Sequence, residues 1–533
     1  MRLIREAAEL AVNNYNNYTD EKLHNIPYFY AFFSDEGACA CHCEWDFGDA
    51  TGRYLDALIL CNEMLGIKEI TPRERDFYES LLWMISFGDD RGNKGLAHRP
   101  TGLEWVTPCV NTFDQRSALM GLVSYYKKSQ DAAVLEVARS MVRGLIAAGA
   151  EIDDYFYLPF SDMYPDTVIE QKPYDIKTNK ADPCHYGGGV HLVPLMMLYD
   201  VTHDADLLEL CRKIINFIKI SGTFDVDGGF FSTGFFAGED GHFHSRMSTV
   251  LGMMMYALET DDGETAGYCE MIYKFAKTQG TSYGFFPEGL GNRPVNGTSD
   301  EYPDVARHTE ICGTADMIHT AILLSKFGKS NYYDDAARFA NHLIASQLTD
   351  ISWIVPSEEK PDESHCTHRD VAARYRGNFT GRTLANDMLN NGRYDNMGCC
   401  SAAGGRALWT LWRYAAEFAD GETTVELWLD CDNDVCKIET DGRGKITVTP
   451  KNSGNVRVRI PDFVKLGDNA DDGYITLRDV RAGECVTIDG KIEREVKRET
   501  LCGETLTVTW LGSEVTDVMP RGKDMVLYPH SVN

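Results

Sequence analysis

The stretch that decides the fold is LMGLVSYYKKSQDAAVLEVARSMVRGLI, residues 119–146. Its apolar residues recur every three or four positions on both sides of a polar break, which predicts two amphipathic helices joined by a short turn. The same pattern returns at 195–218, 253–276 and 322–344. A spacing of roughly 60–70 residues predicts an array of helical hairpins.

About six such hairpins fit before residue 420, and six can close into a ring, the (α/α)6 barrel, or stay open as a solenoid. Loops rich in glycine and aromatic residues interrupt the array at 228–231 and 284–287. Long loops of this kind suit a substrate cleft better than a smooth solenoid. We therefore expect the closed ring, with no long strand in this part of the chain.

After Asp420-Gly421 the apolar period changes from 3.6 to 2. Alternating residues separated by turn signals predict strands of an antiparallel β-sandwich. The sequence thus predicts a catalytic barrel over 1–420 and a sandwich over 421–533 that covers one side of it and carries no catalytic cluster. The clearest alternating segments are 445–449, 456–460 and 506–510.

The chain has 533 residues and a formal charge of -29, from 81 acidic and 52 basic residues. This balance argues against nucleic acid or an anionic membrane as partner, and is compatible with a small neutral carbohydrate. No apolar run reaches the roughly 18 residues of a membrane span. The N-terminal stretch places Glu6 and Glu9 among its apolar residues, which predicts an amphipathic helix and a cytoplasmic protein. A homodimer remains as possible as a monomer.

Two segments, 308–314 and 396–401, combine cysteines with polar residues directly before apolar helical stripes. Their polar groups are therefore expected at helix N-termini, where Thr314 could cap the first helix. The donors that they offer are Glu310, Cys312, Cys399 and Cys400. Three sulfurs and one carboxylate suit tetrahedral Zn²⁺, although lone cysteines are often buried apolar residues instead.

A third cluster, Cys39-Ala40-Cys41-His42-Cys43, places alternate cysteines on one face of an extended segment. It could hold a second metal, but no familiar pair of ligands at metal-binding spacing accompanies it. The alternative is the entry to a helix whose Trp45, Asp46 and Asp49 face the cleft.

Histidines precede two further apolar helices, in the segments 184–191 and 241–246. A lone histidine is often structural, whereas several at successive helix starts favour a rim that binds a sugar. The candidates for this rim are His185, His242 and His244, together with Trp45 and Asp46.

These residues resemble the motifs of glycoside hydrolase family 127, the β-L-arabinofuranosidase-like family. Its Glu-Thr-Cys-Ala and Cys-Cys-Pro-Pro segments correspond here to Glu310-Ile311-Cys312-Gly313 and Cys399-Cys400-Ser401-Ala402. The resemblance implies an (α/α)6 barrel followed by β-sandwich material, and zinc held by all four donors. It also implies that Cys399 is the nucleophile and that His242, in a Gly-His pair before a helix, contacts the sugar.

The general acid/base departs from the family pattern. A gap-free register places the family's glutamate at Pro294, and both prolines after the vicinal cysteines are missing. Glu301 is favoured slightly because its loop leads straight into the zinc segment. Glu288 is the other candidate, because aromatic neighbours could raise its pKa as an acid requires.

The implied reaction is hydrolysis with retention, in which Cys399 attacks the anomeric carbon and the glutamate protonates the leaving oxygen. Two other functions remain open. A sugar epimerase or isomerase on the same barrel would transfer protons with His185, His242 or His244. A non-catalytic carbohydrate-binding protein would use the zinc for stability alone.

Overall fold

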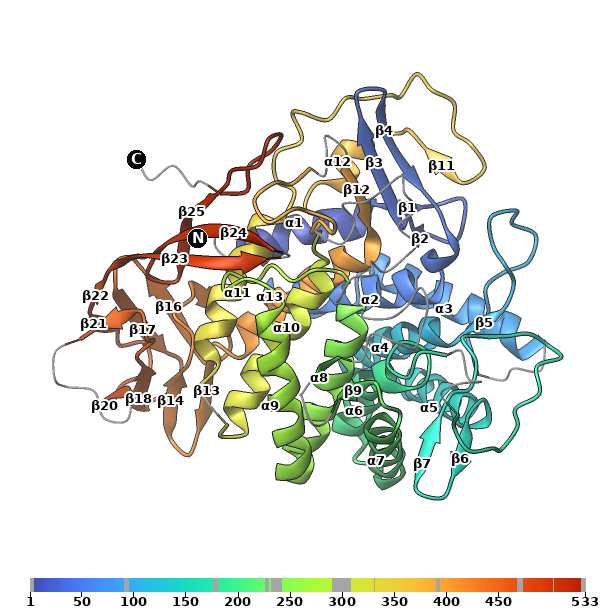
Figure 1. The fold of residues 1–533 in the computed structure, drawn as a ribbon, viewed down its shortest axis with the longest axis horizontal. Coiled ribbons are helices and arrows are strands. Elements are labelled where there is room, and N and C mark those ends of the chain that lie inside the picture. Colours follow the sequence, from blue (N-terminus) through green and yellow to red (C-terminus); the bar gives the residue numbers. More distant parts are fainter. Residues whose placement is uncertain are drawn as a thin grey trace.

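The computed structural model describes residues 4–90, 95–175, 181–225, 230–231, 242–289, 308–329, 331–389, 394–466, 473–501 and 503–528. Helices dominate the first three quarters of the chain (Figure 1). The longer ones are α1 (Ile4–Asn17), α2 (Gly48–Met64), α3 (Pro72–Asp90), α4 (Thr112–Ser129), α5 (Ala132–Ala147), α6 (Leu192–Thr202), α7 (Ala205–Ile220), α8 (Phe243–Thr260), α9 (Gly263–Thr278), α10 (Ile311–Lys326), α11 (Tyr333–Ala345) and α13 (Gly398–Arg413).

The four predicted hairpins are confirmed as α4/α5, α6/α7, α8/α9 and α10/α11. Three of their turns share one design. The first helix ends at a residue with left-handed backbone, and the aspartate that follows caps the second helix by accepting backbone N–H groups. The pairs are Gln130-Asp131, His203-Asp204 and Asp261-Asp262.

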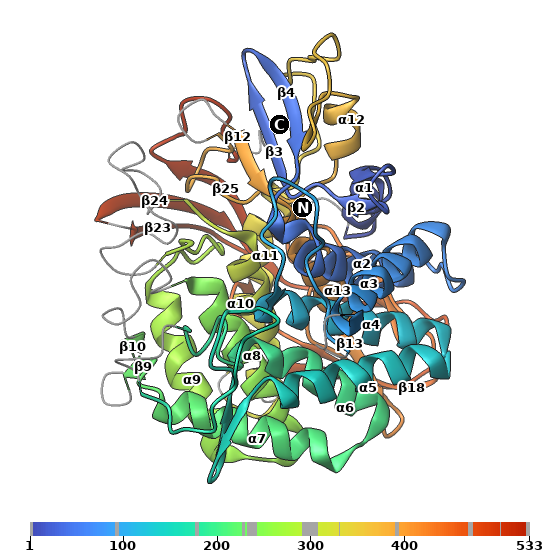
Figure 2. The same cartoon turned by 90° about the vertical axis from the view of Figure 1, so that its right-hand side faces the viewer.

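One helix of each hairpin faces inward. Helices α2, α4, α6, α8, α10 and α13 contact one another in sequence, and α13 returns to α2. Helices α3, α5, α7, α9 and α11 lie outside their partners, while α1 packs on α2 and α13 (Figure 2). The inner layer therefore closes on itself, as expected for a ring and not for an open solenoid.

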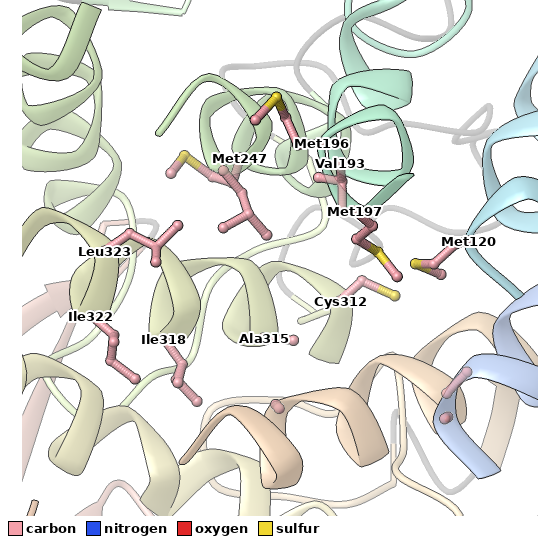
Figure 3. Packing of buried hydrophobic residues seen from close by; sticks show 14 of the residues in the cluster. Met120, Val193, Met196, Met197, Met247, Cys312, Ala315, Ile318, Ile322 and Leu323 are labelled. Atoms are coloured by element: carbon pink, nitrogen blue, oxygen red, sulfur yellow. The ribbon is translucent and has the colours of Figure 1, made fainter. Parts of the chain in front are cut away.

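Small and flexible side chains allow the inner helices to approach closely. A Cβ added to Gly52 on α2 would lie 2.2 Å from the Ser117 carbonyl oxygen on α4, and one on Gly121 would lie 2.6 Å from the Gly52 carbonyl oxygen. Between α4, α6 and α10 the core is filled by Met120, Met197 and Cys312 (Figure 3). Unbranched methionines fill such irregular gaps well.

Short strands that the sequence analysis did not predict lie near the N-terminus. Strands β3 (Tyr30–Ser34) and β4 (Gly37–Cys41) form a hairpin that turns at Gly37, where φ is +118°. It belongs to a four-stranded sheet with the order β11-β4-β3-β12, in which β11 is Cys366–Thr367 and β12 is Tyr394–Met397 (Figure 1). Strand β12 runs directly into α13, so this sheet positions the start of that helix.

The C-terminal part is built of sheets, and the three predicted alternating segments are confirmed as β17, β18 and β24. In β16–β17–β21 the buried Val448 pairs with Ile438 on one side and Val486 on the other. The expected all-antiparallel pairing was wrong for β14 and β18, which are parallel, and β13 begins before residue 421. The strands are β13 (Ala416–Ala419), β14 (Glu422–Val425), β18 (Gly454–Arg459) and β20 (Tyr474–Val480); β15 (Cys431–Asp432), β16 (Cys436–Thr440), β17 (Lys445–Pro450) and β21 (Val486–Asp489); and β23 (Arg494–Leu501), β24 (Glu504–Leu511) and β25 (Glu514–Met519).

The predicted N-terminal amphipathic helix is confirmed as α1, which buries Ile4, Ala7 and Ala11. Among the helices of the described ranges, none combines the length and the apolar character that crossing a bilayer requires.

Candidate metal centre and active-site cavity

Two helix starts bring four potential metal ligands together. Glu310 and Cys312 lie at the beginning of α10, and Cys399 and Cys400 at the beginning of α13. One donor atom from each lies within 4.8 Å of all the others, and all four side chains are buried. The cysteines predicted to share a site thus converge, although almost ninety residues separate them in the sequence. Four donor atoms are the usual number for a zinc ion in a protein.

Backbone geometry directs these side chains. Glu310 precedes α10 with extended backbone, at φ -126° and ψ 121°, and its carboxylate does not cap the helix. The expectation that Thr314 caps α10 was wrong, because Thr314 lies inside the helix and donates its hydroxyl to the Gly284 carbonyl. The Glu310 carboxylate is therefore free of a capping role and faces the three sulfurs.

The residues around the cluster suit a bound metal ion. His242 Nε2 lies 2.8 Å from Glu310 Oε2, while Glu310 Oε1 lies 3.6 Å from the Cys399 sulfur. A carboxylate ligand held by a histidine on its other oxygen is a common outer-shell arrangement at metal sites. Gly381 leaves room for the Cys400 sulfur, which would lie only 2.6 Å from a Cβ at that position.

A buried arginine adds positive charge beside the thiols. Arg53 on α2 places Nη1 3.8 Å from the Cys312 sulfur and Nε 2.6 Å from Asp49 Oδ1. Its Nη2 lies 3.3 Å from His244 Nε2. A buried guanidinium between a carboxylate and a set of potential thiolates offsets their negative charge.

Two pKa shifts describe this environment. Burial raises the pKa of the Glu310 carboxyl, but the charge and hydrogen bond of His242 outweigh it and hold that pKa well below its usual range. Burial raises the pKa of the Cys312 thiol well above its usual value. A divalent cation reverses such a thiol shift, because it favours the thiolate directly.

The cluster opens onto a cavity, whose lining includes Glu310 and Cys399. Six of the residues proposed from the sequence for catalysis or sugar binding line it together with Glu310: Trp45, His185, His242, His244, Glu288 and Cys399. Sequence reasoning missed several other lining residues: Phe29, Tyr30, Arg53, Phe113, Tyr186 and Met397. The signal for Tyr30 in the sequence is its place in an aromatic run, Tyr28-Phe29-Tyr30.

Asp46 is the one proposed sugar contact that the structure turns away from the cavity. Its carboxylate is fully buried, 2.6 Å from His42 Nδ1, and also accepts the Cys43 backbone N–H. Asp49, one helical turn later, lines the cavity in its place. Because α2 begins at Gly48, Asp46 belongs to the preceding 3-10 turn and Asp49 to the helix.

Glu288 lies on the cavity wall between the starts of α8 and α10. Its backbone N–H donates to the His308 carbonyl, and its carbonyl accepts from the Phe243 N–H. Its carboxylate lies 2.5 Å from His308 Nε2 and 3.8 Å from Arg382 Nε. The expected upward pKa shift was wrong: burial raises the pKa, but His308 and Arg382 outweigh it and lower the pKa of Glu288. Glu301 lies outside the described residues.

The histidines form a connected network at the cavity floor. The Ser245 hydroxyl lies 2.5 Å from His185 Nδ1 and 2.7 Å from His242 Nδ1. His244 places Nδ1 2.6 Å from Asp316 Oδ2. His242 therefore connects the cavity lining to Glu310, and the Ser245 hydroxyl holds its ring in place.

We expect Gly381→Ala to weaken metal binding by roughly 10–100-fold, the range found when groups just outside a metal's ligands are altered. The added methyl group would displace the Cys400 sulfur. Zinc affinity measured by competition with a chromogenic chelator checks this. Gly263→Ala is the matched control, because no atom lies within 4 Å of a Cβ there. Equal affinities in the two variants would remove Cys400 from the ligand set.

Comparisons with known proteins identify the fold. No family model matches the sequence, and no curated protein matches it. Among solved structures, a GH127 β-L-arabinofuranosidase from Geobacillus stearothermophilus T6 aligns over 96% of this chain and 80% of its own, with a TM-score of 0.56. This chain has the fold of that enzyme. The identity is 13%, so the likeness shows the fold and not the activity.

Two further solved structures give the same result. A second GH127 β-arabinofuranosidase covers 96% of this chain and 81% of its own at 13% identity, with a TM-score of 0.55. A protein described as a glycoside hydrolase covers 94% and 84% at 12% identity, also with a TM-score of 0.55. The shared fold therefore extends over nearly the whole chain.

Proposed function

We propose that this protein is a zinc-dependent, retaining glycoside hydrolase that acts on a furanoside of the β-L-arabinofuranoside type. One observation carries the proposal: a buried Glu-Cys-Cys-Cys cluster opens onto a cavity lined with histidines, aromatic rings and a second glutamate. The fold shared with GH127 β-arabinofuranosidases supports it. The closed ring of inner helices is the (α/α)6 barrel in this account.

Cys399 is the proposed nucleophile, because among the three cysteines of the cluster it is the one that lines the cavity. Its sulfur attacks the anomeric carbon as the bond to the leaving oxygen breaks. Water then attacks the same carbon, the carbon–sulfur bond breaks, and the sugar leaves with retained configuration. Bound zinc would supply a strong preference for the thiolate over the thiol at this sulfur.

Glu288 is the acid/base that the described residues support. It gives its proton to the leaving oxygen in the first step and takes one from water in the second. His308 and Arg382 position its carboxylate at the cavity wall. The lowered pKa means that Glu288 is ionised in the free protein at neutral pH, so bound substrate must favour its protonated form.

The remaining cavity residues would bind the sugar. Trp45 and Phe113 offer apolar ring faces at 6.0 Å between centroids and 88° between planes. His185, His242 and His244 offer ring nitrogens to hydroxyl groups. A small number of polar groups among aromatic walls is typical of carbohydrate-sized ligand sites.

The epimerase alternative uses the same histidines differently, as proton carriers. His242 already contacts Glu310 through one nitrogen and Ser245 through the other, which suits a fixed supporting role better than proton shuttling. About one zinc per chain, together with hydrolysis, separates the hydrolase from the epimerase. Zinc without any activity would favour the structural role.

The experiment is a panel of nitrophenyl furanosides and pyranosides assayed with and without chelator. We expect release of nitrophenol from the β-L-arabinofuranoside, loss of this activity after metal removal, and recovery when zinc is added. Turnover that is equally fast after complete metal removal would contradict the proposed role of zinc. Turnover of pyranosides alone would contradict the proposed furanoside substrate.

A further inference from the structure

The exposed face of the β3–β4 hairpin continues one wall of the cavity. Phe29 and Tyr30 both line the cavity, and their rings meet edge to face with centroids 5.0 Å apart. Phe32 lies two residues further along β3 and stacks on the Tyr30 ring, at 5.6 Å between centroids and 26° between planes. Phe32 is itself 39% exposed. A row of aromatic rings therefore leads from inside the cavity to solvent.

Strand geometry fixes the direction of this row. Successive side chains of a strand project to opposite faces, so Tyr30 and Phe32 share one face of the sheet. The opposite face is buried, where Ala31 and Phe33 pack in a hydrophobic core. Met397 of β12 is paired with Tyr30 on the shared face and also lines the cavity. Both views show the hairpin extending beyond the ring of helices (Figure 1, Figure 2).

The hairpin is held at both of its edges. On one side β12 pairs with β3, and on the other β11 pairs with β4, to which a disulfide between Cys366 and Cys41 also joins it. The Tyr18 hydroxyl donates to the Tyr30 carbonyl at 2.7 Å. The backbone beneath Phe32 is therefore fixed, and a ligand bound on its ring would need little ordering of the protein.

Tyr30 lies on the side of the cavity from which the leaving group departs. Burial raises the pKa of the Tyr30 hydroxyl, and Cys399 and Glu288 are among the groups whose charges raise it further. In the proposed reaction Cys399 attacks the anomeric carbon, and Glu288 protonates the oxygen that leaves it. A ring close to both groups lies beside the bond that breaks. The part of the substrate beyond that bond then passes from Tyr30 toward Phe32.

We propose that Tyr30 and Phe32 form a platform for the aglycone, the part of the substrate beyond the cleaved bond, and that this aglycone is an uncharged second sugar. The inference rests on the proposed function. The C–H face of a sugar ring is apolar, and a broad aromatic surface removes it from water. Isolated apolar residues are common on protein surfaces. Phe32 differs from these because its ring stacks directly on a ring of the cavity lining.

The charges around Phe32 favour an uncharged ligand. Cys39 of β4 is directly opposite Phe32, so the two side chains lie on the same face. Burial raises the pKa of the Cys39 thiol, while the charges of Lys360 and Glu363 act on it in opposite directions. One cation and one anion beside the platform give neither an acidic nor a basic sugar a net attraction.

The test compares two substrates that share a β-L-arabinofuranosyl unit, the methyl glycoside and a disaccharide in which the same unit is linked to a second arabinose. Phe32→Ala should raise KM for the disaccharide about 3–10-fold more than for the methyl glycoside, because only the disaccharide reaches the platform. Phe32→Trp should retain the wild-type preference. Phe418→Ala is the matched control, since Phe418 on β13 is 38% exposed, and it should change neither substrate.

Binding without turnover separates this inference from the proposed function. Calorimetric titration of Cys399→Ser with both glycosides, repeated in Cys399→Ser/Phe32→Ala, should show the same selective loss for the disaccharide. If wild-type protein hydrolyses neither glycoside and the selective loss persists, the proposed reaction fails and the platform stands. An equal effect of Phe32→Ala on the two glycosides, no effect on either, or no binding of the disaccharide would overturn the platform.

Discussion

Replacing Cys399 with serine should abolish glycoside hydrolysis, with kcat lowered by at least about 10³-fold, while the protein stays folded. A serine hydroxyl at this position is a far weaker nucleophile than a thiolate, because its pKa lies far above neutral. The substitution is nearly the same size as the original, so the buried start of α13 should keep its packing. Steady-state kinetics together with far-UV circular dichroism measures both parts.

Comparison of Cys399→Ser with Cys312→Ser distinguishes the proposed role of Cys399 as nucleophile from a role as metal ligand alone. Both changes remove a sulfur from the cluster, but only Cys399 lines the cavity. Wild-type protein quenched during turnover should carry one sugar on the peptide that contains residue 399, whereas Cys399→Ser should carry none. Near wild-type turnover by Cys399→Ser would refute the assignment.

Glu288→Gln should lower kcat/KM by roughly 10²–10⁴-fold for substrates with poor leaving groups, the usual contribution of a general acid. The amide keeps the size of the side chain and can still bond His308, but it cannot deliver a proton. Aryl glycosides with acidic leaving groups need little protonation, so the first step should recover for them. Kinetics across a series of nitrophenyl and alkyl furanosides measures this dependence.

Glu301→Gln is the comparison, since both glutamates are acid/base candidates in the sequence. We expect a small effect there and no dependence on the leaving group. The opposite pattern, with a large and leaving-group-dependent loss in Glu301→Gln, would transfer the acid role from Glu288 to Glu301.

Much of the fold could be predicted from the sequence, because helical hairpins are local. The apolar period and the polar turn of each hairpin lie within about 30 residues, within reach of pattern reasoning. The β3–β4 hairpin was missed because its strands, with the sequences YAFFS and GACAC, do not alternate apolar and polar residues. The parallel pairing of β14 with β18 joins segments more than 30 residues apart and leaves no local signal.

The residues of the candidate site also fall into two groups, those that local motifs predict and those whose roles depend on distant parts of the chain. The four metal ligands could be proposed because they lie in two short motifs. Arg53, which contacts Cys312 across 259 positions, and Gly381, which makes room for Cys400, have roles set only by the packing of distant segments. The Glu288 pKa was mispredicted for a related reason: His308 is twenty residues away, and its contact with the carboxylate is decided by the fold.

The central claim is that zinc is held by one carboxylate and three sulfurs at the starts of α10 and α13. X-ray absorption at the zinc edge, on reduced protein loaded with a single equivalent of zinc, tests it most directly. Three sulfurs at about 2.3 Å and one oxygen at about 2.0–2.2 Å are expected, with loss of the signal in Cys312→Ala and Cys400→Ala. A shell of oxygen and nitrogen ligands alone, unchanged in those variants, would contradict the account.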